Sequence, residues 1–153
     1  MGIRPQFARG FTLLEVLLAL AAAMLVVGIA VLAVGSNGGE RELKSHAGVL
    51  ETTARGALQR SISSGRPVSL ALSSDGFSLG QNSHQLDQAS LELRRVGEDG
   101  WRPPFAEENW TFHPSGICEP IAVRISGEVG YIELFFDPLT ASVEKTNFVV
   151  AGN

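Results

Sequence analysis

Residues 11–34 read FTLLEVLLALAAAMLVVGIAVLAV, and the only polar members of this run are Thr12 and Glu15. A helix of this length is about 36 Å long, and the hydrocarbon core of a bilayer is about 30 Å thick. A helix buried in the core of a small domain is rarely apolar on every face. The run therefore predicts a helix that spans a membrane.

The charges on either side of the run predict its orientation. Arg4 and Arg9 precede it, whereas residues 40–44 carry charges of both signs. The positive-inside rule then places the N-terminus in the cytoplasm and exports the C-terminal domain. A secretory signal peptide is the alternative, and residues 33–35 faintly resemble its cleavage site. Such peptides have an apolar region of about 7–15 residues, so this run is too long for one.

Glu15 is the single charge inside the apolar run. A carboxylate at the centre of a membrane helix costs about 2.5–3.5 kcal/mol, and less near the end of the helix. The N-terminal end of a helix favours an anion. Either Glu15 reaches water at the headgroup level, or another molecule supplies a charge that pairs with it.

The segment Arg9-Gly10-Phe11-Thr12-Leu13-Leu14-Glu15-Val16, followed by an unbroken apolar stretch, resembles the processing site of type IV pilins and type II secretion pseudopilins. The resemblance implies that residues 1–10 are a leader and that a prepilin peptidase cleaves between Gly10 and Phe11. It also implies N-methylation of Phe11. Glu15 is then the fifth residue of the mature chain, where the family has a nearly universal acid.

The charge chemistry of the cleaved chain agrees with this resemblance. Cleavage creates an α-amino group on Phe11, and the reference pKa of such a group is about 7.7–8.0. Glu15 lies about 6 Å further along the helix. In a helical stack, Glu15 of one subunit can therefore face the amine of a neighbour, and pairing removes the cost of leaving either charge alone. We expect Glu15 to be the charge partner in assembly.

The chain after the apolar run divides into three predicted parts. Residues 35–39 are rich in glycine and interrupt the helical pattern, as a hinge, a melted stretch, a true break in the helix or a plain linker. Residues 40–64 predict an amphipathic helix. Its apolar stripe is formed by Leu43, Ala47, Leu50, Ala54, Leu58 and Ile62. We expect this stripe to pack on the chain's own sheet, because the alanines and nearby glycines make a thin seam for a coiled coil.

Residues 65–153 predict an antiparallel β domain, because short apolar runs alternate with turn signals. The predicted strands are 67–72, 76–79, 91–96, 110–113, 121–126, 131–136 and 147–150. The expected fold class is α+β: one long N-terminal helix, with its first half in the membrane, packed on this domain.

The β region carries a second resemblance, to the H-type minor pseudopilin and related minor pilins. The matching segments are residues 64–70, SGRPVSL, residues 110–116, WTFHPSG, and residues 137–140, DPLT. The last segment is normally followed by Gly, where this chain has Ala141. The residues of the turn alone predict that Asp137 caps it, Pro138 presets φ and Thr140 closes it.

Composition excludes several classes of protein. The 153 residues hold 12 Lys and Arg against 16 Asp and Glu, a net charge of −4, so we expect no nucleic-acid partner. Cys118 is the single cysteine, which excludes an intrachain disulfide and a cysteine-based zinc site. A small buried hydrophobe is its expected role. The three histidines, at 46, 84 and 113, show no ligand spacing.

No motif for catalysis, cofactor binding or metal binding is found in the sequence. Ser115 and Ser126 have no evident partners of a nucleophile site. The adjacent acids at 98–99 and 107–108 are expected to be solvated loop residues. The major pseudopilin of the resembled family binds calcium through a C-terminal acidic loop. Residues 147–153 hold no acid, so we expect no such site.

These observations predict a non-enzymatic minor pseudopilin of a type II secretion system, near the tip of the filament that pushes folded proteins across the outer membrane. The implied partners are other pseudopilins, the prepilin peptidase, an inner-membrane assembly platform and inner-membrane lipid. The implied location is the bacterial inner membrane, single-pass with a periplasmic C-terminal domain, and then the periplasmic filament. The alternatives are a type IV minor pilin for adhesion, motility or DNA uptake, and a tethered periplasmic enzyme or ligand-binding domain.

Overall fold

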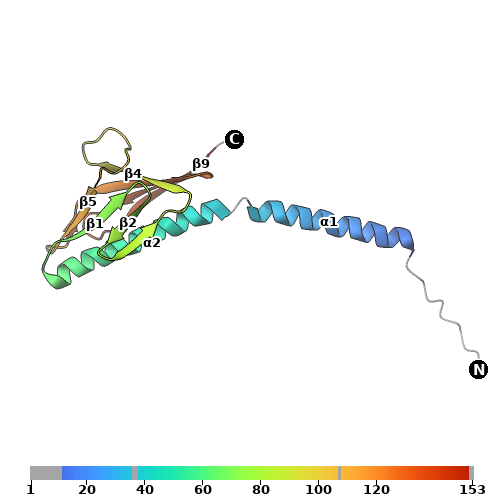
Figure 1. Ribbon diagram of the computed structural model, residues 1–153, viewed down its shortest axis with the longest axis horizontal. Coiled ribbons are helices and arrows are strands. Elements are labelled where there is room, and N and C mark those ends of the chain that lie inside the picture. Colours follow the sequence, from blue (N-terminus) through green and yellow to red (C-terminus); the bar gives the residue numbers. More distant parts are fainter. Residues whose placement is uncertain (1–11, 36–37, 107, 152–153) are drawn as a thin grey trace, which may run out of the picture. The chain divides into compact units, whose positions relative to one another are not determined.

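Two helices come first in the chain, α1 over Leu13–Gly35 and α2 over Gly38–Ser64 (Figure 1). The computed structural model describes residues 12–35, 38–106 and 108–151, and in α1 it describes side chains as far as Gly28. The helices belong to separate compact units, residues 1–38 and residues 39–153. The nine strands that follow α2 in the described chain all belong to the second unit.

The prediction of a single long N-terminal helix is wrong. The structure has two helices in place of one, and the strands of the second unit form two antiparallel sheets. Glycine weakens a helix by about 1 kcal/mol relative to alanine, and glycines stand at the end of α1 and at the beginning of α2. The predicted break over 35–39 falls partly on residues outside the described ones.

The predicted membrane span over 11–34 also needs correction. Among the described residues, no helix combines the length and the apolar character that crossing a membrane requires. The predicted single-pass location in the inner membrane, with the N-terminus in the cytoplasm, is contradicted by this finding.

Helix α2 supplies one side of the core of the second unit. Leu43, Ala47, Leu50, Ala54 and Leu58 are all buried, as the periodicity predicts. The predicted stripe fails at its last member, because Ile62 is exposed and Ser61 is fully buried in its place. The Ser61 hydroxyl lies 3.0 Å from the carbonyl oxygens of Arg66 and Phe112, so it can donate a hydrogen bond where an apolar side chain could not.

Five strands form the first sheet, in the order β3-β2-β1-β5-β6. Their bounds are Val68–Ser73 for β1, Gly76–Leu79 for β2, Asn82–Gln85 for β3, Glu108–His113 for β5 and Ile117–Cys118 for β6. The other sheet has the order β4-β7-β8-β9. Its strands are β4 over Ala89–Arg95, β7 over Ile121–Gly127, β8 over Gly130–Phe136 and β9 over Val143–Val150.

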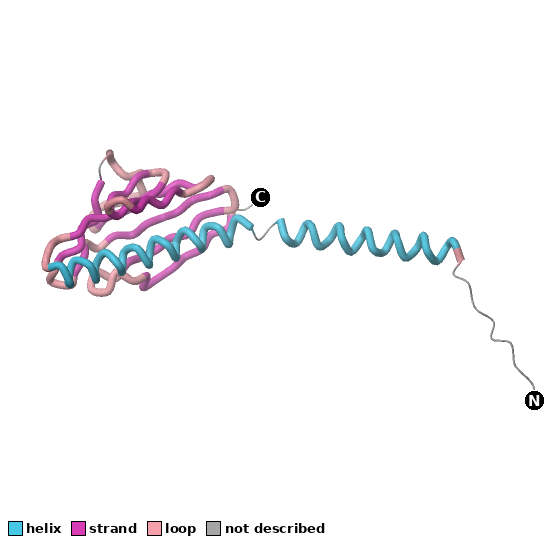
Figure 2. Tube along the Cα trace, turned by 60° about the horizontal axis from the view of Figure 1, so that its bottom comes forward, coloured by secondary structure: helices cyan, strands magenta, loops and turns pink. Residues whose placement is uncertain are grey.

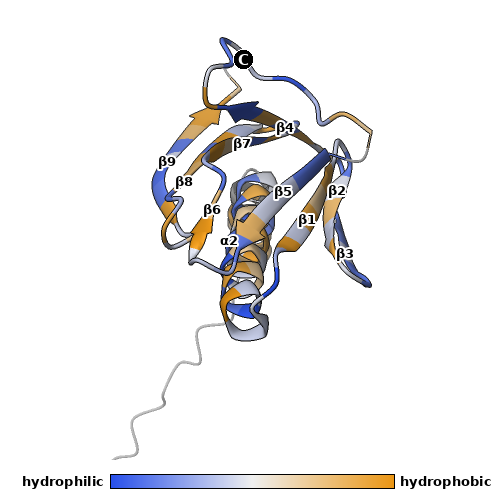
Figure 3. Ribbon diagram, turned by 90° about the vertical axis from the view of Figure 1, so that its left-hand side faces the viewer, coloured by the Kyte–Doolittle hydropathy of each residue, from blue (hydrophilic) through white to orange (hydrophobic). Residues whose placement is uncertain are grey.

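The two sheets arch around α2 (Figures 2 and 3). Buried apolar side chains of the strands and of α2 form one core. Trp110 lies at the centre and is fully buried. Its ring centroid is 4.7 Å from that of Phe112 and 4.8 Å from that of Phe136. The carboxylate of Glu51 accepts a hydrogen bond of 3.2 Å from the Val143 amide, which fastens α2 to the beginning of β9. These contacts hold the sheets in place, so that the outer face of the four-stranded sheet is a fixed surface.

Candidate functional site

The residues predicted for processing lie at the N-terminal end of the chain. Gly10 and Phe11 fall outside the described residues. Glu15 lies in the first turn of α1 and is exposed. The structure therefore describes one of the three predicted site residues.

The backbone around Glu15 shows a local role that the sequence analysis missed. The Glu15 amide donates to the Thr12 carbonyl oxygen at 3.0 Å and to the Thr12 hydroxyl oxygen at 3.3 Å. Thr at the N-cap with Glu three residues later is the capping-box pattern of a helix start. The signal was present in the sequence as Thr12-Leu13-Leu14-Glu15. Glu15 therefore stands at the position that the capping-box pattern gives to its acid.

The side of α1 that follows this cap carries apolar side chains that nothing in the described chain covers. Ten large apolar side chains lie between Leu13 and Val27, and each is about half exposed or more, from 48% at Val16 to 80% at Leu13. A soluble monomer rarely exposes a contiguous apolar surface of this extent. Within its own compact unit, α1 therefore has no core that buries these side chains.

In the second unit, acids expected to be solvated form an ion cluster instead. Arg102 makes two hydrogen bonds to the Glu108 carboxylate, of 2.7 and 3.0 Å, and one to Glu98 of 2.9 Å. Arg95 donates to Glu108 at 3.0 Å and also contacts Glu119. The Glu108 side chain is 8% exposed. The expectation for Glu108 is wrong because residues 96–106 fold back and bring Arg102 onto it.

The arginines change the acidity of these carboxyl groups. The hydrogen bonds from Arg102, helped by the Phe105 amide and Arg95, lower the pKa of Glu108 to about 2. The Arg95 amide and Arg102 lower the pKa of Glu98. Glu107 lies outside the described residues. Because backbone hydrogen bonds between Leu93 and Arg102 also join this loop to the edge of β4, the cluster fixes the loop and with it Trp101.

Trp101 lies over the outer face of the four-stranded sheet, where arginines and aromatic rings alternate. The guanidinium of Arg124 is 4.3 Å from the Trp101 ring centroid and 4.6 Å from that of Tyr131. Arg124 also forms ion pairs with Glu133 at 2.8 Å and Glu92 at 3.5 Å. The charge of Arg124 is therefore neutralised within the sheet.

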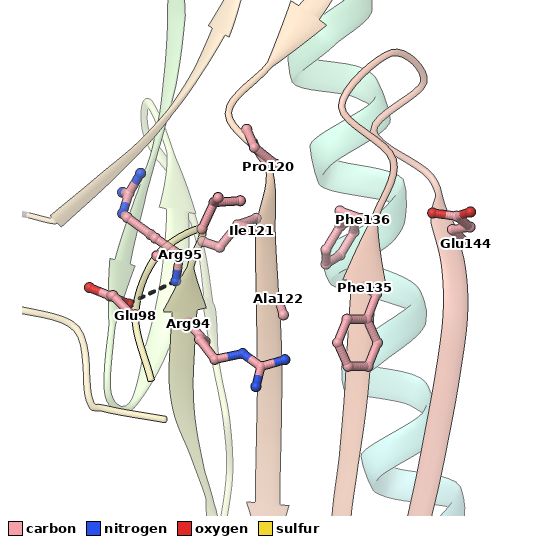
Figure 4. A pocket seen from close by; sticks show the side chains of 11 residues that line it. Arg94, Arg95, Glu98, Pro120, Ile121, Ala122, Phe135, Phe136 and Glu144 are labelled. Atoms are coloured by element: carbon pink, nitrogen blue, oxygen red, sulfur yellow. Dashed lines mark hydrogen bonds between the residues drawn. The ribbon is translucent and has the colours of Figure 1, made fainter. Parts of the chain in front are cut away.

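A hollow of about 420 Å³ opens at the end of this face where β4 ends and β7 begins (Figure 4). Arg94 and Phe135 stand on either side of Ala122, and Glu144 lies at the far rim. The Arg94 guanidinium is 5.0 Å from the Trp101 ring centroid and 5.9 Å from that of Phe135. Sequence alternation marks the outward residues of each strand, but it gives no sign of which strands lie side by side.

Two histidines that the sequence separates by 38 positions meet between α2 and β3. Nδ1 of His46 lies 2.9 Å from Nε2 of His84, so one of these nitrogens must lack a hydrogen. Burial first, and then the neighbouring His46, lower the pKa of His84, while Asp87 opposes the shift. Within the described ranges no three His, Cys, Asp or Glu side chains gather as a ligand set for a metal ion. The pair is therefore a contact between helix and hairpin.

Two smaller predictions about side chains are confirmed. Cys118 is buried, and this burial raises the pKa of its thiol to about 11. At the turn after β8, the Asp137 carboxylate accepts hydrogen bonds from the Leu139 amide at 2.8 Å and the Thr140 hydroxyl at 3.1 Å. Ala141, which replaces the glycine of the resembled family, is buried and has φ of 52°. The turn thus keeps a left-handed residue there without a glycine.

Comparisons of the chain with models of protein families, with curated proteins and with solved structures find no match.

Proposed function

We propose that this chain is a minor pseudopilin, a structural rather than catalytic subunit of a type II secretion filament. In this role it joins other pseudopilins in the short filament that pushes folded proteins across the outer membrane. The prepilin peptidase and the assembly platform are its other partners. The proposal rests on the motif at residues 9–16 and on the helix that follows it.

The exposed apolar surface of α1 is the single observation that carries the proposal. Ten large apolar side chains of the described part of this helix are uncovered by the chain itself. In a filament, the same helices of neighbouring subunits would cover them. Burial of apolar surface is the main favourable term in such association, so packing of α1 against its neighbours would stabilise the assembly.

Glu15 would set the register of that packing. The residue is exposed in the first turn of α1, and cleavage after Gly10 would place a new amine close to it. An amine of a neighbouring subunit would pair with the carboxylate once apolar helices surround both, because attraction between opposite charges grows as water is excluded. The second unit has its own core, so it would remain folded while α1 packs with other subunits.

The first experiment is the intact mass and the N-terminal peptide of the protein recovered from cells with and without an active prepilin peptidase. We expect a chain that begins at N-methylated Phe11 only in cells with the active enzyme. A chain that keeps residues 1–10 in both strains would overturn the proposal.

A second experiment separates the two roles of Glu15. Glutamine keeps the capping-box hydrogen bonds but carries no charge. We therefore expect Glu15→Gln to be processed like the wild type and to lose most of its incorporation into filaments, measured by co-purification with sheared filaments. Glu92→Gln is the matched control, because it removes the same charge from the second unit. Normal incorporation of Glu15→Gln would contradict the assembly role.

A further inference from the structure

One row of side chains crosses the outer face of the four-stranded sheet and holds two cations that form no ion pair within the described residues. The strand register places Arg94 of β4 beside Ala122 of β7, Ala122 beside Phe135 of β8, and Phe135 beside Lys145 of β9. Both cations lie near the Phe135 ring, at 5.9 Å for Arg94 and 5.7 Å for Lys145. The neighbouring row contains Arg124 between Glu92 and Glu133 and is neutralised. The first row is therefore a positive stripe on a protein of net charge −4.

Arg94 differs from the other half-buried arginines of the chain. Arg95, Arg102 and Arg124 each form ion pairs with at least two carboxylates. Arg94 lies near two aromatic rings and forms no ion pair or hydrogen bond within the described residues, although its charge helps to lower the pKa of Glu133. A guanidinium close to aromatic rings keeps its fork of N–H donors available. The Arg94 guanidinium can therefore donate hydrogen bonds to an acceptor that the described residues do not supply.

The hollow beside Arg94 has room for that acceptor. Ala122 has the smallest side chain of the row, so space of about 420 Å³ remains between Arg94 and Phe135 (Figure 4). Val96 at the rim is 80% exposed, and Phe135 forms one wall. Glu98 and Glu144 also line the hollow, and their charges disfavour a ligand that is anionic throughout. An occupant would therefore place a carboxylate at Arg94 and an apolar group over Phe135.

We propose that this hollow binds a protein segment that presents an acidic side chain next to an apolar one. The Arg94 guanidinium would take the carboxylate through two parallel hydrogen bonds, as arginine–carboxylate pairs do. Phe135 and Val96 would contact the apolar side chain, and Lys145 would draw the acidic segment toward the sheet. The proposal is independent of the filament function, because it uses only residues of the second unit.

The test is a titration of the full-length protein, kept in solution with a non-ionic detergent, at 0.15 M salt. The probe is the peptide N-acetyl-Phe-Glu-amide, and the comparison is N-acetyl-Phe-Gln-amide. The readout is the indole ¹⁵N–¹H signal of Trp101, assigned with the variant Trp101→Phe. We expect a saturable shift with the Glu peptide and about tenfold weaker binding of the Gln peptide, the usual scale for one charged hydrogen-bonding group.

Two variants and one control keep the test decisive. Arg94→Gln should weaken binding of the Glu peptide about tenfold, and Arg66→Gln, which removes the same charge from an exposed site elsewhere, should not weaken it. Ala122→Leu should abolish binding by filling the hollow without a change of charge. Unchanged binding in Arg94→Gln or Ala122→Leu would overturn the proposal. An equal shift with inorganic phosphate alone would also overturn it, because the hollow would then accept any anion.

Discussion

Glu108 is a carboxylate with 8% of its side chain exposed, held by two arginines. Its pKa of about 2 lies below that of an unfolded glutamate, so folding favours the charged form. The cluster therefore stabilises the fold fully above about pH 4.5, and this stabilisation is lost as the pH falls toward 2. The loss removes the ion pairs that hold residues 96–106 against β4.

This acid dependence gives a prediction at the residue scale. Glu108→Gln should destabilise the second unit by about 2 kcal/mol at pH 7, because the half-buried guanidinium groups of Arg95 and Arg102 lose the carboxylate that they share. The difference from the wild type should shrink as the pH falls from 5 to 2.5. Urea unfolding followed by circular dichroism at several pH values measures both effects. Glu128→Gln, in an exposed turn, is the control, and a constant difference at all pH values would contradict the assignment.

At the scale of single residues, the sequence could not predict contacts between residues that lie far apart in the chain. Adjacent acids such as those at 107–108 resemble a solvated loop, because the arginines that pair with Glu108 are brought to it only by the folded loop. The contact of His46 with His84 spans 38 positions and leaves no local pattern. By contrast, the burial of Cys118 and the Asp137 turn follow from local chemistry, and both could be predicted.

Among the elements, the hairpin of β7 and β8 depends on glycine. Gly130 pairs with Gly127 across a two-residue loop and has φ of 141°. A Cβ atom on Gly130 would lie 2.0 Å from the Val149 carbonyl oxygen of β9. Real side chains do not approach a backbone oxygen this closely, so β8 and β9 would have to separate.

We therefore expect Gly130→Ala to destabilise the protein by at least about 2 kcal/mol, through a forbidden backbone conformation and the lost pairing of β9. Gly100→Ala is the matched control, because a Cβ there meets no atom within 4 Å. Its effect should stay within about 0.5 kcal/mol. Urea unfolding of both variants measures the difference, and equal stabilities would show that β9 is not packed as described.

Elements with a strong periodicity could be predicted, and elements without one could not. The amphipathic pattern predicted α2 to within a few residues, and seven strands lie close to their predicted ranges. The prediction missed β3, because its sequence Asn82-Ser83-His84-Gln85 has no apolar member. It also missed β6, which has only two residues. Both strands form because they pair with neighbouring strands, and their own residues have no strong preference for β structure.

At the scale of the whole molecule, every residue of the described core lies between Leu43 and Ala141. The second unit therefore contains its core within residues 39–153. The relation of helices to sheets could not be predicted, because the pairing of β1 with β5 and of β4 with β7 joins segments far apart in the chain. The expectation of one long helix failed for a local reason, because glycines stand at the end of α1 and at the beginning of α2.

This independence predicts the result of truncation. A chain of residues 39–153 should unfold cooperatively, with a Tm within about 4 °C of the transition of the second unit in the full-length protein, a change of less than about 1 kcal/mol. Thermal unfolding followed by near-ultraviolet circular dichroism measures it. Leu50→Ala in the same truncated chain should lower its stability by about 2–5 kcal/mol. Non-cooperative unfolding of the truncated chain would show that residues 1–38 contribute to the core.

The buried thiol of Cys118 has a practical consequence for labelling. With its pKa raised to about 11 and its sulfur within the core, the thiol carries almost no nucleophilic thiolate at pH 7.5. An alkylating reagent would reach the sulfur only when β5 and β6 separate. The rate of its modification therefore measures how often this part of the sheet opens. Cys118 therefore does not react on the time scale of surface labelling. Single cysteines placed on α1 or beside Arg94 can be cross-linked to neighbouring molecules without replacing Cys118 first.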